Sequence, residues 1–414
     1  KSEGMYANEP FITREGKTLN VVSDGGVEYN YGNVDESEYL KWNEWAKKSS
    51  KQLMSVGIVD YIKTGELDPY PVWQKGMTYV SWQPMGYKKI ESQMSFPRME
   101  KETNASWVNI VTTWYQEGVD STEIIPHPDK TPNEEALEFM FKRARRLGLH
   151  IMFTPLVDLL NKEGGVWRSD ISFHTNEEWD AWFASYRNFI LKYAEVAEKN
   201  DMDIFNVGTE LYFTTSKRPD KWVELIKDVR KVFSGRLIYT ANWFEEYKEV
   251  RFWEYLDYAG ISAYFPLADD DKPSYGEIKK NCEKWAVEIE AWQKIHGKPV
   301  VFSEVGYKSI EGAAKEPWNF ISGGKVDIKQ QYNCYKAVLE TFWDKEWFYG
   351  MYWWAWRTNV LISGKFHRGY TPYDKPAAKL LYKWYMKPDP HKYISKVRLV
   401  TDLLEKRAEQ KTDR

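Results

Sequence analysis

DIFNVGTE, residues 203–210, is a short apolar run that ends in a glutamate. Similar runs recur along the chain and alternate with longer segments whose apolar residues follow a helical period. This alternation is typical of a sheet of parallel strands that are joined by helices. Eight such runs are present, which predicts that the sheet closes into a barrel. They are Met77–Trp82, Trp107–Thr112, His150–Pro155, Ile204–Thr209, Arg236–Ala241, Tyr258–Tyr264, Pro299–Glu304 and Gly350–Trp356.

Helix signals separate the expected strands. The clearest helix begins after Thr175, where Glu178 stands three residues later and completes a capping box. Between Trp179 and Ala197 the aromatic and apolar residues recur at helical spacing, so we interpret this stripe as the face packed on the barrel. An open, doubly wound sheet is the alternative architecture. The lack of a glycine-rich turn after the first strand argues against it.

The predicted fold is α/β, a (β/α)8 TIM barrel with an N-terminal extension and a C-terminal helical tail. The barrel is expected over residues 75–387. Residues 1–74 are expected to pack on it as an extension with one amphipathic helix, residues 36–54, and several turns rich in glycine and tyrosine. Residues 388–414 are expected to form a charged helix that docks on the outside or serves self-association.

Composition argues against several classes of partner and cofactor. The 58 basic and 61 acidic residues leave a net charge of −3, without the basic surplus of a nucleic-acid-binding protein. No apolar run approaches the roughly 20 residues that cross a bilayer, so no membrane partner is expected. The histidines are scattered and the two cysteines are too few for a disulfide framework, so no metal or other cofactor is expected. The chain begins at Lys1 without a signal segment, which we interpret as a processed form and which favours secretion.

Two glutamates stand where barrel enzymes place their reacting groups. Glu210 ends the fourth expected strand and Glu304 ends the seventh, and the loops after strand ends build the pocket of a barrel. Either carboxylate alone could instead cap a helix or form an ion pair. Both together favour cleavage of a glycosidic bond, which needs one protonated and one ionised carboxyl group. A separation of about 5–5.5 Å gives retention of configuration, and about 6.5–9.5 Å gives inversion.

Four motifs together resemble glycoside hydrolase family 113 of clan A, whose characterised members are β-mannanases. They are NVGTEL (206–211), FSEVGY (302–307), VWR (166–168) and YWWAWR (352–357). The resemblance implies a retaining double displacement with Glu210 as acid/base and Glu304 as nucleophile. In the larger clan A families an asparagine precedes the acid/base, whereas Thr209 stands here, as in family 113. Residues 1–74 and 308–326 lie outside the resemblance, which leaves the substrate open.

Further residues are expected to contact the sugar. By clan resemblance Tyr264 hydrogen-bonds Glu304, although a tyrosine on the rim is equally consistent with its position. Trp354 is expected to be the platform under the sugar that is cleaved, and strict alternation puts Trp356 on the same face. The other candidates lie at or just beyond strand ends. They are Trp82, Trp114, Trp167, Arg168, Asn242 and Trp243, with Trp318 and Asn319 as weaker ones.

These features predict an endo-acting β-1,4-mannanase that cleaves mannan or glucomannan and needs no cofactor. One alternative is a clan A glycosidase for another β-glycan, or an exo-acting β-mannosidase, which a blocked cleft would favour. A second alternative is a non-catalytic carbohydrate-binding barrel. Aromatic residues, 16% of the chain, suit a sugar-binding surface as well as a large core. The non-catalytic alternative keeps the tryptophans but has no reason to keep both Glu210 and Glu304.

Overall fold

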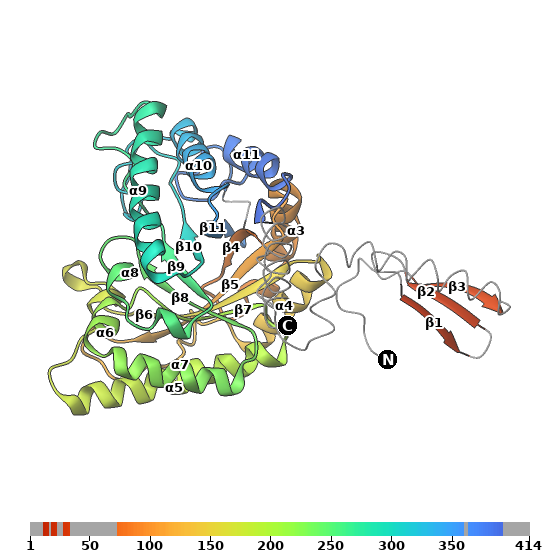
Figure 1. Ribbon diagram of the computed structural model, residues 1–414, viewed down its shortest axis with the longest axis horizontal. Coiled ribbons are helices and arrows are strands. Elements are labelled where there is room, and N and C mark those ends of the chain that lie inside the picture. The colour runs from red at the N-terminus through yellow and green to blue at the C-terminus, as the bar shows by residue number, and fades with distance from the viewer. Residues whose placement is uncertain (1–10, 16–17, 23–27, 34–72, 360–362, 392–414) are drawn as a thin grey trace, which may run out of the picture. The chain divides into compact units, whose positions relative to one another are not determined.

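A computed structural model describes residues 11–15, 18–22, 28–33, 73–359 and 363–391 (Figure 1). The chain divides into two compact units, of which the larger spans Trp73–Pro390. The larger unit contains the barrel. Its two ends are joined, because the backbone N–H of Trp73 donates to the Asp389 carboxylate at 2.8 Å.

Eight parallel strands form a closed barrel in the order β10-β11-β4-β5-β6-β7-β8-β9. This confirms the predicted (β/α)8 fold, and the strands follow each other around the barrel in chain order (Figure 1). The strands are β4 (Gln74–Val80), β5 (Trp107–Gln116), β6 (His150–Leu159), β7 (Ile204–Thr209), β8 (Arg236–Asn242), β9 (Tyr258–Ser262), β10 (Val300–Val305) and β11 (Phe348–Arg357).

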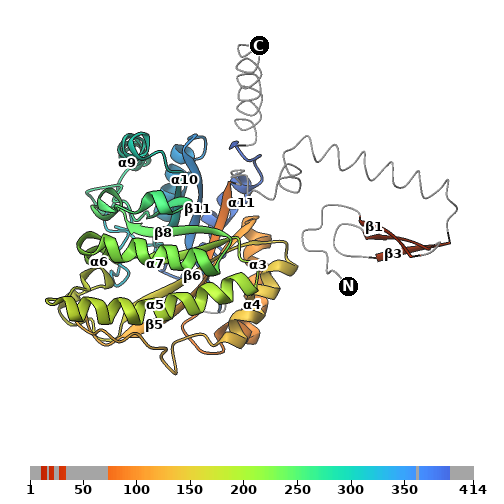
Figure 2. The same cartoon turned by 60° about the horizontal axis from the view of Figure 1, so that its bottom comes forward.

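Helices cover the outside of the barrel, and α5 packs beside α7 (Figure 2). The Thr175 capping box is formed, with the Thr175 side chain accepting from Glu178 N–H and the Glu178 carboxylate accepting from Thr175 N–H. The helices are α3 (Ile90–Thr103), α4 (Glu134–Arg146), α5 (Asn176–Lys199), α6 (Tyr212–Lys217), α7 (Pro219–Val232), α8 (Glu246–Glu249), α9 (Tyr275–His296), α10 (Ile328–Phe342) and α11 (Pro376–Tyr385). Short 3-10 turns are η1 (Gly86–Lys88), η2 (Glu163–Gly165), η3 (Arg168–Asp170) and η4 (Trp253–Tyr255).

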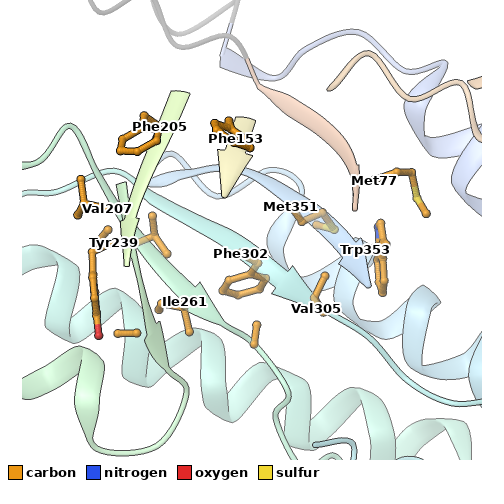
Figure 3. Close-up of a cluster of buried hydrophobic side chains, with 14 of the residues drawn as sticks. Met77, Phe153, Phe205, Val207, Tyr239, Ile261, Phe302, Val305, Met351 and Trp353 are labelled. Carbon is orange, nitrogen blue, oxygen red and sulfur yellow. The ribbon is translucent and has the colours of Figure 1, made fainter. Parts of the chain in front are cut away.

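The barrel interior is filled by side chains in layers, so it is a packed core and not a pore. The lower layer consists of Trp107, Met152, Ile204, Ile238, Tyr258, Val301 and Tyr352. An upper layer of Val80, Val111, Leu156 and Ala355 supports Trp354 at the C-terminal ends of the strands. The opposite face of each strand packs on the helices through rings such as Phe205, Tyr239 and Phe302 (Figure 3). These two layers hold the strand ends in fixed places.

The smaller unit contains an antiparallel sheet of three strands in the order β1-β2-β3. Its strands are β1 (Phe11–Glu15), β2 (Thr18–Val22) and β3 (Glu28–Asn33). The sequence analysis expected turns rich in glycine and tyrosine in this region and did not predict these strands, each of which is only five or six residues long. The helices predicted at 36–54 and in the tail after Pro390 lie outside the described residues. The packing of residues 1–74 on the barrel therefore stays a prediction.

Candidate active site

Glu210 and Glu304 lie at the C-terminal ends of their strands. Glu210 follows β7 and Glu304 lies in β10, and each is 7% exposed. Glu210 has a φ of +54°, in the left-handed region that costs a non-glycine residue roughly 1 kcal/mol or more. Its conformation is held by hydrogen bonds on both sides. Its own N–H donates to the Thr240 carbonyl at 2.8 Å, and the N–H of Leu211 donates to the Tyr239 hydroxyl at 2.9 Å.

One oxygen of Glu210 is held by two donors from the loop after β6. The indole N–H of Trp167 and a guanidinium N–H of Arg168 both donate to Oε2, each at 2.9 Å. Arg168 is buried and also lies 3.6 Å from a carboxylate oxygen of Asp158. Among the described residues no hydrogen bond reaches Oε1 of Glu210. That oxygen is therefore the one able to exchange a proton with a ligand.

Glu304 is held in a similar way by a residue just beyond the end of β9. The hydroxyl of Tyr264 donates to Oε2 of Glu304 at 3.0 Å, which is the contact that the clan resemblance implied. The Tyr370 ring packs edge-on against the Tyr264 ring, with centroids 6.1 Å apart. Within the described part of the chain, Oε1 of Glu304 accepts no hydrogen bond. Each carboxylate thus keeps one oxygen fixed and one oxygen available.

Burial governs the charge of Glu304. Desolvation, reinforced by the negative charge of Glu210, raises the pKa of Glu304 to about 8, while Arg168 and the Tyr264 hydrogen bond oppose the rise. Burial and the charge of Glu304 also raise the pKa of Tyr264 well above its usual value, so its hydroxyl stays a donor. Without ligand, burial therefore favours the protonated form of Glu304 near neutral pH.

A third carboxylate, Glu246 in α8, was missed by the sequence reasoning. It is fully buried, and it accepts from the Tyr239 hydroxyl at 2.5 Å and from the Asn242 backbone and side-chain amides at 2.8 and 3.0 Å. Burial raises the pKa of Glu246 to about 7. Because Tyr239 also binds the backbone N–H of Leu211, Glu246 links the ends of β7 and β8. No local pattern marks it, since its partners come from separate elements.

Asn242 ends β8, as expected, and Glu246 fixes the orientation of its side-chain amide. Its amide N–H group donates to the Glu246 carboxylate, so its Oδ1 is left as an acceptor among the described residues.

The tryptophans on the other side of the barrel are accessible. Trp82, just beyond β4, is 42% exposed, and its ring lies 6.2 Å from the partly exposed ring of Trp354. Trp243 is partly exposed beyond β8, and its ring centroid lies 5.2 Å from that of Trp318.

Two expected site residues donate their indole N–H groups to side chains of the surrounding helices. Trp356 is completely buried, and its indole N–H donates to Ser95 of α3 at 3.0 Å. The pairing of β11 with β4 shifts register between Trp353 and Trp356, which breaks the strict alternation on which the prediction relied. The prediction of sugar contact by Trp356 is corrected accordingly. Trp114 donates its indole N–H to the Tyr193 hydroxyl of α5 at 2.8 Å, but its ring is partly exposed, so its contact with sugar stays a prediction.

Among the described residues, no group of three His, Cys, Asp or Glu side chains could hold a metal ion. None of their helices is long and apolar enough to span a bilayer. A cavity of about 670 Å³ lies away from both carboxylates. It is lined by Ser216, Lys248, Glu249, Val250, Arg251, Trp253, Glu254, His296 and Lys298.

Comparisons with known proteins bear on the family and the fold. A model of Glycoside Hydrolase Family 113 matches residues 77–375. A GH113 beta-1,4-mannanase in complex has 28% identity over 76% of this chain and 99% of its own, with a TM-score of 0.69. The GH113 beta-mannanase of Alicyclobacillus acidocaldarius has 26% identity over 76% and 97%, with a TM-score of 0.67. The β-glucuronidase of Ruminococcus gnavus, at 15% identity, 76% and 50% coverage and a TM-score of 0.53, shares the fold. Among curated proteins, none matches this sequence.

Proposed function

This chain belongs to glycoside hydrolase family 113, and on that premise we propose that it is a retaining enzyme that cleaves β-1,4-linked mannan or glucomannan. The enzyme is a glycoside hydrolase, and its substrate is an oligosaccharide or polysaccharide. The observation that carries the mechanism is the pair of buried glutamates at the ends of β7 and β10. Each has one oxygen held by protein donors and one oxygen available to the substrate.

In the first step, Oε1 of Glu210 donates a proton to the glycosidic oxygen while Oε1 of Glu304 attacks the anomeric carbon. The bond between the anomeric carbon and the glycosidic oxygen breaks, and the leaving sugar departs with its new hydroxyl group. The product on the protein is a glycosyl ester of Glu304 with inverted configuration. The Tyr264 hydroxyl stays on the other oxygen of Glu304 and holds the carboxyl plane for attack.

In the second step, Glu210 acts as a base. Its carboxylate takes a proton from water, the water oxygen attacks the anomeric carbon, and the ester bond to Glu304 breaks. The second inversion restores the original configuration, and Glu210 is again protonated. Trp167 and Arg168 fix Oε2 of Glu210 in both steps. The same oxygen, Oε1, therefore gives the proton in the first step and takes one in the second.

The chemistry needs the proton on Glu210 and the charge on Glu304, whereas burial favours a proton on Glu304 in the free protein. The negative charge of Glu210 contributes to the raised pKa of Glu304, about 8 without ligand, and this contribution disappears when Glu210 is protonated. A sugar with developing positive charge at its anomeric carbon stabilises the ionised form of Glu304. A glycosidic oxygen beside Glu210 accepts a hydrogen bond only from the protonated form. Substrate thus favours the productive distribution.

The choice of mannan rests on the relatives, two of which are β-mannanases that this chain covers almost completely. Mannose differs from glucose by an axial 2-hydroxyl, so discrimination needs oriented polar groups near the cleaved sugar. Asn242 supplies one, because Glu246 fixes its Oδ1 as an acceptor for a sugar hydroxyl. Trp354 and Trp82 supply partly exposed rings for the C–H faces of the sugar.

The roles are tested with an aryl β-mannoside that has a good leaving group, in the presence of azide. Glu304→Ala lacks the nucleophile, so azide attacks the substrate directly and the product is an α-mannosyl azide. Glu210→Ala still forms the ester, so azide replaces water in the second step and the product is a β-mannosyl azide. Glu195→Ala, on the exposed side of α5, is the control and should behave as wild type. Exchanged azide products would reverse the two roles.

The substrate is tested by product analysis on β-mannan, glucomannan and mixed-linkage β-glucan. Wild type should release short oligosaccharides from the two mannose-containing polymers, and Glu304→Ala should release none. Activity on the β-glucan alone would keep the mechanism and contradict the substrate. Binding without cleavage of any of the three polymers would favour a non-catalytic carbohydrate-binding barrel.

A further inference from the structure

The loop after β10 has an unusually well fixed backbone. We call residues 316–322 the β10 loop. The buried ammonium group of Lys308 donates to the carbonyl oxygens of Asn319, Phe320 and Ser322. The Tyr370 hydroxyl donates to the carbonyl oxygen of Pro317 at 2.6 Å. A buried cation that binds several carbonyl groups is costly to displace, so this loop holds one conformation.

The β10 loop reaches across the mouth of the barrel. Phe320 contacts Trp167 with ring centroids 5.7 Å apart, and Trp167 belongs to the loop after β6. In the closed order of strands, β6 and β10 lie on opposite sides of the barrel. Trp318 contacts Trp243, which follows β8, at 5.2 Å. The loop therefore extends over the ends of β7, β8 and β9, next to the ring that donates to Glu210.

Despite this fixed backbone, the β10 loop exposes apolar side chains. Trp318, Phe320 and Ile321 are 45%, 58% and 81% exposed. Folding of the barrel gives no reason to hold large apolar groups in water at this point. A sugar gives one, because its C–H faces pack on aromatic rings. Trp82 and Trp354 lie at β4 and β11, so the side of the mouth that the loop does not cover also carries accessible rings.

We propose that the β10 loop closes the mouth on the β7–β9 side, and that Phe320 and Trp318 form the last sugar-binding position there. The chain of a β-linked substrate then enters over Trp82 and Trp354 and ends against the loop. The enzyme cuts at a fixed, short distance from one end of the chain. This inference rests on the proposed function, since it assigns a substrate position to the same site.

The experiment follows the products that wild type and variants release from end-labelled mannohexaose. Wild type should release one short product from the start of the reaction. Phe320→Ala and Trp318→Ala should release products of several lengths, and their kcat/KM on mannohexaose should fall about fivefold, the effect of one aromatic contact. Tyr382→Ala removes an exposed ring from α11 and should leave both the products and kcat/KM unchanged.

Lys308→Met provides a second way to release the β10 loop from its fixed conformation. It removes the cation that binds the loop carbonyls but leaves every exposed ring in place, so its products should also spread to several lengths. A mixture of lengths from wild type, unchanged in Phe320→Ala and Trp318→Ala, would overturn the proposal. The proposal would also be overturned if Phe320→Ala, Trp318→Ala and Lys308→Met all released the same products as wild type.

Failure of the proposed function is recognised separately. If wild type cleaves no β-mannan, binding of mannohexaose and cellohexaose to Glu304→Gln is measured by calorimetry, with and without Phe320→Ala. An affinity that drops about fivefold with Phe320→Ala would keep the sugar position on the loop and reject only the reaction. Equal affinities, or no binding in either variant, would overturn the sugar position as well.

Discussion

The pH dependence of stability tests whether Glu304 holds a proton in the folded protein. Burial and the charge of Glu210 raise the pKa of Glu304 from 4.5 to about 8. A raised folded-state pKa gives a stabilisation that is fully present below the unfolded pKa and is lost as the pH rises through the folded pKa. Glu304→Gln keeps the shape of the side chain and stays neutral at every pH. The variant should therefore lack this loss.

The magnitude follows from the two pKa values. The rise from 4.5 to about 8 corresponds to about 5 kcal/mol, because one pKa unit is worth about 1.4 kcal/mol. We expect Glu304→Gln and wild type to be equally stable near pH 4.5. Near pH 9 the variant should be more stable by about 5 kcal/mol. Glu246, whose pKa burial raises to about 7, affects both proteins in the same way and cancels in the difference.

The assay is urea unfolding of the full chain, followed by tryptophan fluorescence between about pH 4.5 and about pH 9. The quantity of interest is the difference in unfolding free energy between Glu304→Gln and wild type. Glu195→Gln changes an exposed carboxylate of α5 and should track wild type throughout. A difference that does not change with pH, or a variant less stable than wild type near pH 9, would refute the reasoning.

Three further predictions concern other residues of the barrel. Glu246→Gln should lower kcat/KM about tenfold, because Asn242 loses its fixed orientation, and unchanged kinetics would contradict this. The same variant should be more thermally stable than wild type above about pH 7. Trp354→Ala should raise KM in oligosaccharide assays, whereas Trp356→Ala, fully buried, should lower the unfolding free energy by about 3–5 kcal/mol in urea titrations with little change in KM. Asp158→Asn should lower kcat about tenfold on mannan, whose leaving sugar needs a proton from Glu210. It should not lower kcat on an aryl mannoside whose leaving group needs no proton. Equal losses on both substrates would contradict the role of Asp158 in supporting the acid.

Much of the site could be predicted because a barrel gives strand ends a defined place. β7 was predicted at Ile204–Thr209, its observed bounds, and β10 was predicted one residue early. Apolar runs of five or six residues between helices are strong local signals for strands. Closure of the parallel sheet then places the C-terminal ends of all strands on one side of the barrel. Glu210 and Glu304 therefore come together at one end of the barrel although they are far apart in the chain.

Features that depend on contacts between separate elements could not be predicted. Trp354 and Trp356 have the same residue type and the same parity, yet a register shift in β11 turns one to the mouth and the other to Ser95 in α3. Glu246 follows another acidic residue after a strand, which is the pattern of an exposed turn. Its burial depends on hydroxyl and amide donors from β8 and α6 that no local pattern reveals.

Asp158 makes the acid role of Glu210 physically consistent. Protonation of Glu210 removes the nearest negative charge from Arg168, and a buried cation without a counter-charge is strongly destabilising. Arg168 lies 3.6 Å from Asp158 as well as 2.9 Å from Glu210, so a carboxylate remains beside it when Glu210 takes a proton. Lys162 donates to the other oxygen of Asp158 at 2.9 Å. The guanidinium can therefore hold Oε2 of Glu210 in both protonation states, while Oε1 alone changes its proton.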